Sequence, residues 1–191
     1  GIIPSDLVYR NPAFDVKMIG FDVPHHIYAP IIGSDIIRTS KNDFCVLEDN
    51  CRIPSGVSYM IENREIMMRM FPDIFQQMKV ESVDNYPQHL LNTLMSLKPK
   101  NCYGEPNVVL LTPGPLNSAY YEHTYLADTM GIELVQGSDL YVEDGRTYMM
   151  TTVGPKKIDV IYRRIDDKFL DPLSYDNSSL IGIPGLFDSY K

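Results

Sequence analysis

The spacing of apolar and polar residues divides the chain into a strand-rich start, a helical middle and a mixed end. Two short β-favouring runs, Ile31–Ile37 and Phe44–Asn50, flank the polar segment 39–43, which has the composition of a turn. From Val57 to Met70 apolar residues recur at helical spacing, and a second helix is expected to begin near Pro87, because proline suits the first helical position. The pattern therefore predicts a hairpin followed by two helices.

The apolar side of each predicted helix is expected to fill the core. These positions are Met60, Ile61, Met67 and Met68 in the first helix, and Leu90, Leu91, Leu94 and Leu97 in the second. Methionine is flexible and fills irregular gaps, so the methionine stripe is interpreted as core filling and not as a cofactor site.

The last 85 or so residues read as alternating strands and helices, and this order is typical of parallel sheets. The predicted elements are buried strands at 107–111, 132–135 and 158–162, and a helix over about 117–130. Asn117 or Ser118 is expected to cap this helix at its start, and Gly131 to follow its end. The dipeptide Asp144-Gly145 between two alternating runs predicts a β-hairpin. The fold class is therefore α/β, with a Rossmann-like core and an inserted hairpin.

Composition and charge narrow the classes of partner. Of 191 residues, 44% are hydrophobic, which excludes a disordered chain, and the net charge of -8 argues against nucleic acid as a main partner. No apolar run approaches the length of a membrane span, and the start lacks a secretory signal. Three cysteines without CxxC spacing fit a reducing cytoplasm.

Both ends of the sequence look cut, since it opens at Gly1 and stops at Lys191 shortly after an apolar run. We therefore expect a piece of a larger polypeptide, whose main partner is the remainder of that polypeptide. Core surface left exposed by truncation could also drive the formation of a homo-oligomer.

Carboxylates in the predicted hairpin give the sharpest chemical signal. A turn centred between Lys41 and Asn42 pairs Asp35 with Glu48, Ile37 with Val46, and Thr39 with Phe44. Because side chains alternate along a strand, Glu48, Asn50 and Arg52 would share one face, provided that the strand runs that far.

Two carboxylates directly opposite each other repel, and a hard divalent cation would reverse that cost. Asp35, Glu48 and Asn50 offer three oxygen ligands for Mg²⁺, and Arg52 could steady a phosphate beside them. The alternative is a solvated face on which arginines pair with these carboxylates, and a register slip of one residue would part Asp35 from Glu48.

The second part of the chain offers groups that could hold an anionic substrate. The turn 112–118 lies where a strand leads into a helix, so that Ser118, Glu122 and His123 would lie near a helix N-terminus that could receive a carboxylate. The turn lacks GxGxxG spacing, which excludes a dinucleotide fingerprint. The alternative here is a rigid Pro-Gly turn before a capped helix.

Two arginines end the last predicted strand, at the edge of the sheet where ligands gather in open α/β folds. Arg163 or Arg164 could bind a carboxylate or a phosphate bidentately. The alternative is that they form surface ion pairs with Asp166 and Asp167, which follow at once.

Several segments resemble those of the ATP-grasp enzymes. VLEDNCRIPSG resembles the Glu-x-Asn strand that holds Mg²⁺ in that fold, and GSDIIR resembles the preceding strand, whose aspartate is the third ligand. Here this strand pair precedes the Rossmann-like unit, which is similar to the order of the circularly permuted ATP-grasp family related to glutathionylspermidine synthase. The resemblance extends to GIIPSDLVYRNPAF, PSGVSYMIENRE, LTPGPLNSAYYEHTYLA and IDVIYRRIDDKFLDPL, and so covers nearly the whole chain.

The resemblance implies three regions. Residues 1–66 would be the C-terminal portion of an ATP-grasp domain, 67–105 a helical connector, and 106–191 a Rossmann-like pre-ATP-grasp unit truncated at its C-terminus. In the permuted order, the strands whose lysines clamp ATP would follow Lys191, so the fragment alone is expected to be inactive.

The resemblance also implies an activity, namely that of a carboxylate–amine ligase that uses Mg²⁺ and ATP and acts through an acyl phosphate. Asp35, Glu48 and Asn50 would hold the metal, Asn50 and Arg52 the nucleotide, and Arg52 would support the reacting phosphates. Small-molecule carboxylate and amine substrates would bind near Arg163, Arg164, Ser118, Glu122 and His123. The competing interpretations are a non-catalytic scaffold module with this fold and a Mg²⁺-dependent phosphotransferase or hydrolase.

Overall fold

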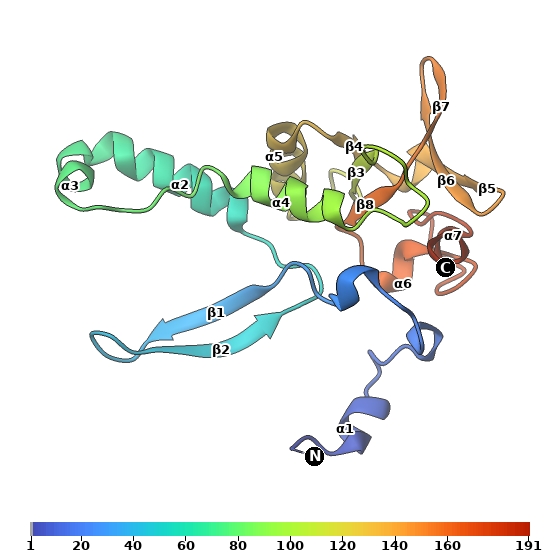
Figure 1. The fold of residues 1–191 in the computed structure, drawn as a ribbon, viewed down its shortest axis with the longest axis horizontal. Helices are drawn as coiled ribbons and strands as arrows, with labels where there is room; N and C mark the ends of the chain where they lie inside the picture. The colour runs from blue at the N-terminus through green and yellow to red at the C-terminus, as the bar shows by residue number, and fades with distance from the viewer. Residues whose placement is uncertain (1) are drawn as a thin grey trace.

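A three-stranded parallel sheet forms the centre of the second half of the chain (Figure 1), in a computed structural model that describes residues 2–191. Its strands are β3 (Val108–Leu111), β4 (Glu133–Val135) and β8 (Val160–Arg163), in the order β4-β3-β8. All four residues of β3 are buried, as expected for a continuous apolar run in a strand that is covered on both faces. The predicted α/β class with a parallel core is confirmed.

Helices cover one face of this sheet. Helix α5 (Tyr120–Met130) connects β3 to β4, and α4 (Tyr86–Ser96) brings Leu90 and Leu94 into the same core as β3 and β8. Helix α5 ends at Gly131, whose φ of 67° is the left-handed conformation that glycine adopts without steric cost. The helix begins later than predicted, at the N-cap Ala119, because Asn117 instead accepts a hydrogen bond from the Ala119 backbone N–H (2.9 Å) in the preceding turn.

An antiparallel sheet packs beside the parallel one and shares a second core with it. Its strands are β5 (Leu140–Glu143), β6 (Arg146–Thr151) and β7 (Gly154–Lys157). Asp144 and Gly145 form the β5–β6 turn with positive φ at both positions, which confirms the predicted hairpin. Strand β7 was not predicted, because GPKK lacks both an apolar pattern and β-favouring residues.

The short helices α6 (Asp167–Leu170) and α7 (Leu186–Tyr190) complete the second half of the chain, and η3 (Gly137–Asp139) leads into β5. At the other end, α1 (Ser5–Tyr9) and the 3-10 turns η1 (Val16–Met18) and η2 (Pro24–His26) precede the first strand. Among residues 2–191, no helix combines the length and the apolar composition that crossing a bilayer requires.

A hairpin followed by helices makes up most of the first half of the chain (Figure 1). The hairpin strands are β1 (Gly33–Arg38) and β2 (Phe44–Asn50), and every residue of β2 is exposed. The hairpin is followed by α2 (Val57–Met70), whose bounds match the prediction, and then by α3 (Pro72–Gln77). Helix α3 was not predicted, although Pro72 occupies its first turn, where proline is well tolerated.

The expectation that the methionines of α2 fill the core is wrong for this structure. Ile61 is buried (3% exposed), but Met60, Met67 and Met68 are 39–49% exposed. The reason is that α2 packs against α5 near its N-terminus, and its later turns project away from the sheet (Figure 1). Periodicity marks the apolar side of a helix but does not show how much of that side is covered.

Candidate functional site

The predicted pairing of the hairpin carboxylates is confirmed. Asp35 lies directly opposite Glu48 in the β1–β2 ladder, and Gly33 lies opposite Asn50. Opposite residues of an antiparallel pair project from the same face, and Asn50 follows Glu48 by two positions, so all three predicted metal ligands lie on one face.

The pairs on the turn side of the hairpin differ from the prediction by one residue. Ile37 lies opposite Cys45 and Arg38 opposite Phe44, whereas Val46 and Thr39 were expected in these pairs. The connection has five residues, 39–43, and is closed by the Thr39 N–H and hydroxyl, which both donate to the Asp43 carbonyl (3.0 and 3.2 Å). An odd number of loop residues centres the turn on Lys41 and shifts the register.

A β-bulge restores the predicted register where the carboxylates lie. The register shifts between Asp35 and Ile36, and Leu47 is the extra residue on β2. If the turn-side register continued, Asp35 would face Leu47, and the two carboxylates would project from opposite faces of the hairpin. Bulges are frequent next to active sites because they redirect side chains in this way. The bulge is therefore the local feature that brings Asp35 and Glu48 together.

The chemistry of these side chains fits a hard divalent cation. Asp35 and Glu48 are both exposed, and in the part of the chain that the structure describes neither forms an ion pair. Residues 2–191 contain no group of three His, Cys, Asp or Glu side chains placed to hold a metal, and the third ligand predicted here is the amide of Asn50. Carboxylate and amide oxygens are the ligands that Mg²⁺ prefers, and it completes its shell with water and phosphate.

Arg52 lies outside the strand, contrary to the condition that β2 runs that far. Strand β2 ends at Asn50. The Arg52 guanidinium contacts two carboxylates from the second half of the sequence. Its Nη2 donates to Asp166 Oδ1 (3.0 Å), and its Nη1 lies 3.9 Å from Asp167 Oδ2. Asp167 also forms an ion pair with Arg163. This contact was the alternative to substrate binding that the sequence offered for that arginine.

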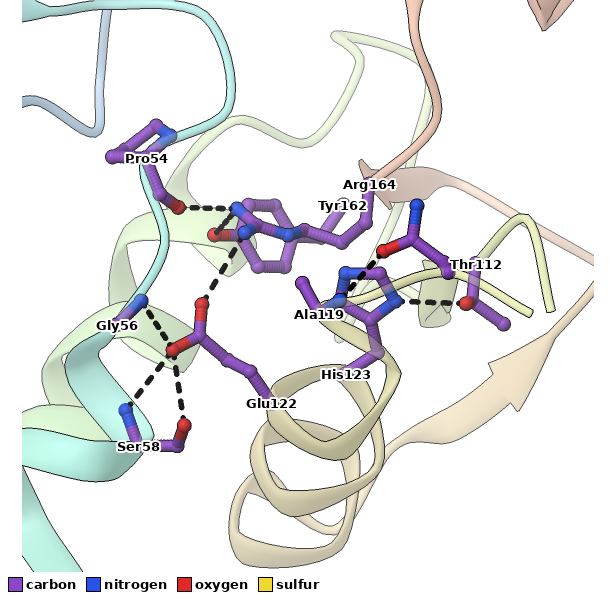
Figure 2. Close-up of polar contacts among 10 residues, drawn as sticks. Pro54, Gly56, Ser58, Thr112, Ala119, Glu122, His123, Tyr162 and Arg164 are labelled. Atoms are coloured by element: carbon purple, nitrogen blue, oxygen red, sulfur yellow. Dashed lines mark hydrogen bonds and ion pairs between the residues drawn. The ribbon is translucent and has the colours of Figure 1, made fainter. Parts of the chain in front are cut away.

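A buried ion pair in the second half of the chain also forms hydrogen bonds with the first half (Figure 2). Arg164 Nη2 lies 3.3 Å from Glu122 Oε1, and the two side chains are 2% and 1% exposed. Arg164 Nη1 also donates to the Pro54 carbonyl (2.6 Å) and to the Tyr162 hydroxyl (3.1 Å). The segment after the hairpin is thus attached to the end of β8.

Glu122 also caps helix α2 from another helix. Its Oε2 accepts hydrogen bonds from the backbone N–H groups of Gly56 (2.6 Å) and Ser58 (3.1 Å), and from the Ser58 hydroxyl (3.0 Å). The first N–H groups of a helix have no partner within the helix, and a carboxylate there also interacts favourably with the helix dipole. Gly56 has a φ of 107°, a conformation that favours glycine and lets its N–H reach the carboxylate. The Pro54-Ser55-Gly56 segment therefore has a structural role, because its backbone bonds to both members of the buried ion pair.

His123 occupies a buried position beside this ion pair (Figure 2). Its Nδ1 lies 2.8 Å from Thr112 Oγ1, which accepts a hydrogen bond from the Gly114 N–H (3.2 Å). Burial, with the charge of Arg164 as the second cause, lowers the pKa of His123 from 6.5 to about 4. The imidazole is therefore neutral at physiological pH, and the Thr112 hydroxyl is free to donate to its Nδ1.

The five residues predicted to bind substrate fall into two groups. Ser118 is exposed and the Arg163 side chain is 31% exposed, so both are accessible. Arg164, Glu122 and His123 are buried and bonded to protein groups, and their contact with a substrate stays a prediction.

Three residues of this region, Asp166, Asp167 and Pro54, were not predicted to belong to a site. The only signal for the aspartates was their place a few residues after β8, at the end of a parallel sheet where ligands bind in open α/β folds.

Comparisons with known proteins identify relatives of the chain. An uncharacterized protein of Synechocystis is 47% identical over all 191 residues, which are 40% of its own length. An uncharacterized protein of Mycobacterium tuberculosis is 48% identical over the same residues, 34% of its length. A Frankia alni protein named "Putative glutamate--cysteine ligase 2-3" is 37% identical over 135 residues, which are 71% of this chain and 16% of that protein.

The chain thus spans 40% or less of the length of these relatives. The family described as "A circularly permuted ATPgrasp" matches residues 1–191. Since that match includes the carboxylate hairpin, the connector and the Rossmann-like unit, the chain belongs to the circularly permuted ATP-grasp family.

Proposed function

We propose that this chain is part of an ATP-dependent carboxylate–amine ligase and supplies its metal-holding hairpin and a substrate-binding unit. The observation that carries the proposal is the pair Asp35 and Glu48, placed opposite each other by a bulge and without a compensating cation among residues 2–191. Membership of the ATP-grasp family supports ATP as the nucleotide, and the ligase name of one relative supports the reaction class.

In this proposal the hairpin holds Mg²⁺ through Asp35, Glu48 and Asn50. The metal would neutralise charge on the nucleotide phosphates, and Arg52 would support the same phosphates from the end of the hairpin. The bulge at Leu47 keeps the two carboxylates on one face and so sets the shape of the metal site.

The reaction would join a small-molecule acid to an amine. The acid would take the γ-phosphoryl group of ATP to form an acyl phosphate, and the amine would then displace phosphate to form an amide. Arg163 is the accessible arginine at the end of β8 and would orient the acid, with Ser118 near the start of α5. Arg164, Glu122 and His123 would fix the position of this edge relative to the hairpin.

The chain would perform this reaction in the cytoplasm together with the rest of a longer polypeptide, and we expect it to be inactive alone. Its relatives are more than twice as long. In this proposal the lysines that clamp ATP come from the rest of the longer polypeptide. A non-catalytic scaffold is the competing function, and nucleotide binding distinguishes the two.

Removal of the metal ligands is expected to weaken nucleotide binding more than about tenfold, equivalent to about 1.4 kcal/mol. The test is isothermal titration of the full-length protein with a non-hydrolysable ATP analogue and Mg²⁺, comparing the wild type with the variant Glu48→Ala/Asn50→Ala. The loss follows because two of the three protein oxygens would no longer bind the metal that bridges protein and phosphates.

Asp49→Ala provides the matched control. Asp49 lies between the two ligands in sequence but projects from the other face, where it accepts a hydrogen bond from Ser34 (2.5 Å). This control should bind the analogue with wild-type affinity. Equal binding by the wild type and the double variant would contradict the metal site, and no binding by the wild type would favour the scaffold function.

A further inference from the structure

We infer that Asp166 and Asp167 are positioning residues that hold the Arg52 guanidinium toward the nucleotide phosphates. The inference rests on the proposed function, in which Arg52 supports those phosphates. It names two residues that would act on the nucleotide through another side chain, from a part of the chain 114 residues away.

Four side chains of alternating charge connect the hairpin to the end of β8. Asp166 Oδ1 accepts a hydrogen bond from Arg52 Nη2 (3.0 Å), and Asp167 Oδ2 lies 3.9 Å from Arg52 Nη1. The other oxygen of Asp167 pairs with Arg163, whose Nη1 donates to the Ile165 carbonyl (2.8 Å). Asp167 thus lies between the two arginines that the proposed function assigns to phosphate and to acid.

Arg52 depends on these carboxylates for a fixed orientation. It lies two residues beyond the last ladder residue of β2, and its side chain is 58% exposed. Its backbone N–H donates to the Asn50 side chain (3.2 Å), which fixes the main chain but not the guanidinium. Without Asp166 and Asp167, the long side chain would be free to rotate in solvent.

The contribution of these ion pairs to the stability of the fold is too small to explain them. Exposed ion pairs contribute little to folding, and the buried Arg164, which donates to the Pro54 carbonyl, already attaches the same segment to the end of β8. Arg52 has five N–H donors, and the contacts with the aspartates leave its Nε and further N–H groups for an incoming anion. Fixing a flexible side chain before binding is worth about two- to tenfold in affinity.

Whether removal of Asp166 raises or lowers the affinity for the nucleotide distinguishes a positioning role from simple charge repulsion. Removal of a carboxylate near an anionic nucleotide would tighten binding if only the charge mattered. Loss of the group that orients Arg52 would weaken it. We therefore expect Asp166→Ala to weaken binding of the non-hydrolysable ATP analogue about fivefold.

A double-mutant cycle in the full-length protein tests this inference. Analogue affinity with Mg²⁺ is measured for the wild type, Asp166→Ala, Arg52→Ala and the double variant. The fivefold effect of Asp166→Ala should vanish in the Arg52→Ala background, Asp166→Glu should restore most of the affinity, and thermal unfolding should stay unchanged. Asp22→Ala is the control, since Asp22 is also exposed and lies near two basic side chains, His26 (3.4 Å) and Lys100 (3.8 Å).

The outcomes distinguish the inference from the proposed function. Wild-type affinity in Asp166→Ala, tighter binding, or an effect that persists in the Arg52→Ala background would each overturn the positioning role alone, provided that Arg52→Ala itself weakens binding. Unchanged affinity in Arg52→Ala would instead overturn the phosphate role of Arg52 and the inference with it. Absence of binding by the wild type would overturn the proposed function as a whole.

Discussion

Replacing Arg164 by alanine is expected to lower the free energy of unfolding by about 3–5 kcal/mol. The guanidinium is 2% exposed and bonds to Glu122, the Pro54 carbonyl and the Tyr162 hydroxyl. Its removal leaves a buried carboxylate without its cation and a buried carbonyl without its donor, and both penalties are large in a low-dielectric interior. Urea denaturation followed by circular dichroism measures the loss.

Two further variants show whether the buried charge is the cause. Arg163→Ala removes the neighbouring arginine, whose pair with Asp167 is partly exposed, and should cost less than about 1 kcal/mol. The double variant Arg164→Met/Glu122→Gln should be more stable than Arg164→Ala, because no unpaired charge remains. A loss in Arg164→Ala no larger than that in Arg163→Ala would show that the buried ion pair and its hydrogen bond to Pro54 do not stabilise the fold as expected.

The buried Nε of Arg164 lacks a hydrogen-bond partner within residues 2–191. Such a donor lowers the net value of the network, since a buried polar group without a partner costs free energy. The value of the ion pair therefore lies in the elements that it connects and not in the largest possible gain in stability. It joins the start of α2, the end of β8 and the first turn of α5 at one point (Figure 2).

Local signals were enough to predict the parallel strands, the long helix and the first hairpin of the Rossmann-like unit, but not β7. The run VVLL suits a central strand that is covered on both faces, Gly131 provides a left-handed helix end, and Asp144-Gly145 provides a tight turn. Each of these features depends on a few neighbouring residues. The helix α2 was predicted to the residue for the same reason.

The register of the carboxylate hairpin could be predicted only in part from local sequence patterns. The metal-side pairs were predicted correctly, although the turn itself is centred one half-residue away. Two departures, an odd loop and a bulge at Leu47, cancel each other. Period-two alternation contains no signal for either, because a bulge is an extra residue whose position depends on how the two strands pair.

Long-range contacts of the candidate site could not be predicted from spacing. Glu122 meets Gly56 and Ser58 across more than 60 residues, and Arg52 meets Asp166 across 114. A glutamate in the first turn of a helix is ordinarily explained by its own helix dipole. Here the same carboxylate also serves the first turn of a second helix, which only the packing of α2 against α5 makes visible.

Acidification is expected to destabilise the protein through His123 by about 2–3 kcal/mol between pH 7 and pH 4.5. The fold lowers the pKa of this imidazole from 6.5 to about 4, mainly by burial. As the pH falls below 6.5, the unfolded chain takes up a proton that the folded chain does not. The contribution of the neutral His123 is therefore complete above about pH 6.5 and is lost as the pH falls toward 4.

His123→Asn tests the assignment, because an asparagine oxygen can accept the Thr112 hydrogen bond but does not titrate in this range. The wild type should lose more stability than the variant between pH 7 and pH 4.5, and the difference between their urea-denaturation curves isolates His123 from the carboxylates that both proteins share. Parallel pH dependence would show that the imidazole accepts a proton within the fold. That would require a rearrangement around Thr112 and Arg164, whose donor and charge both favour the neutral ring.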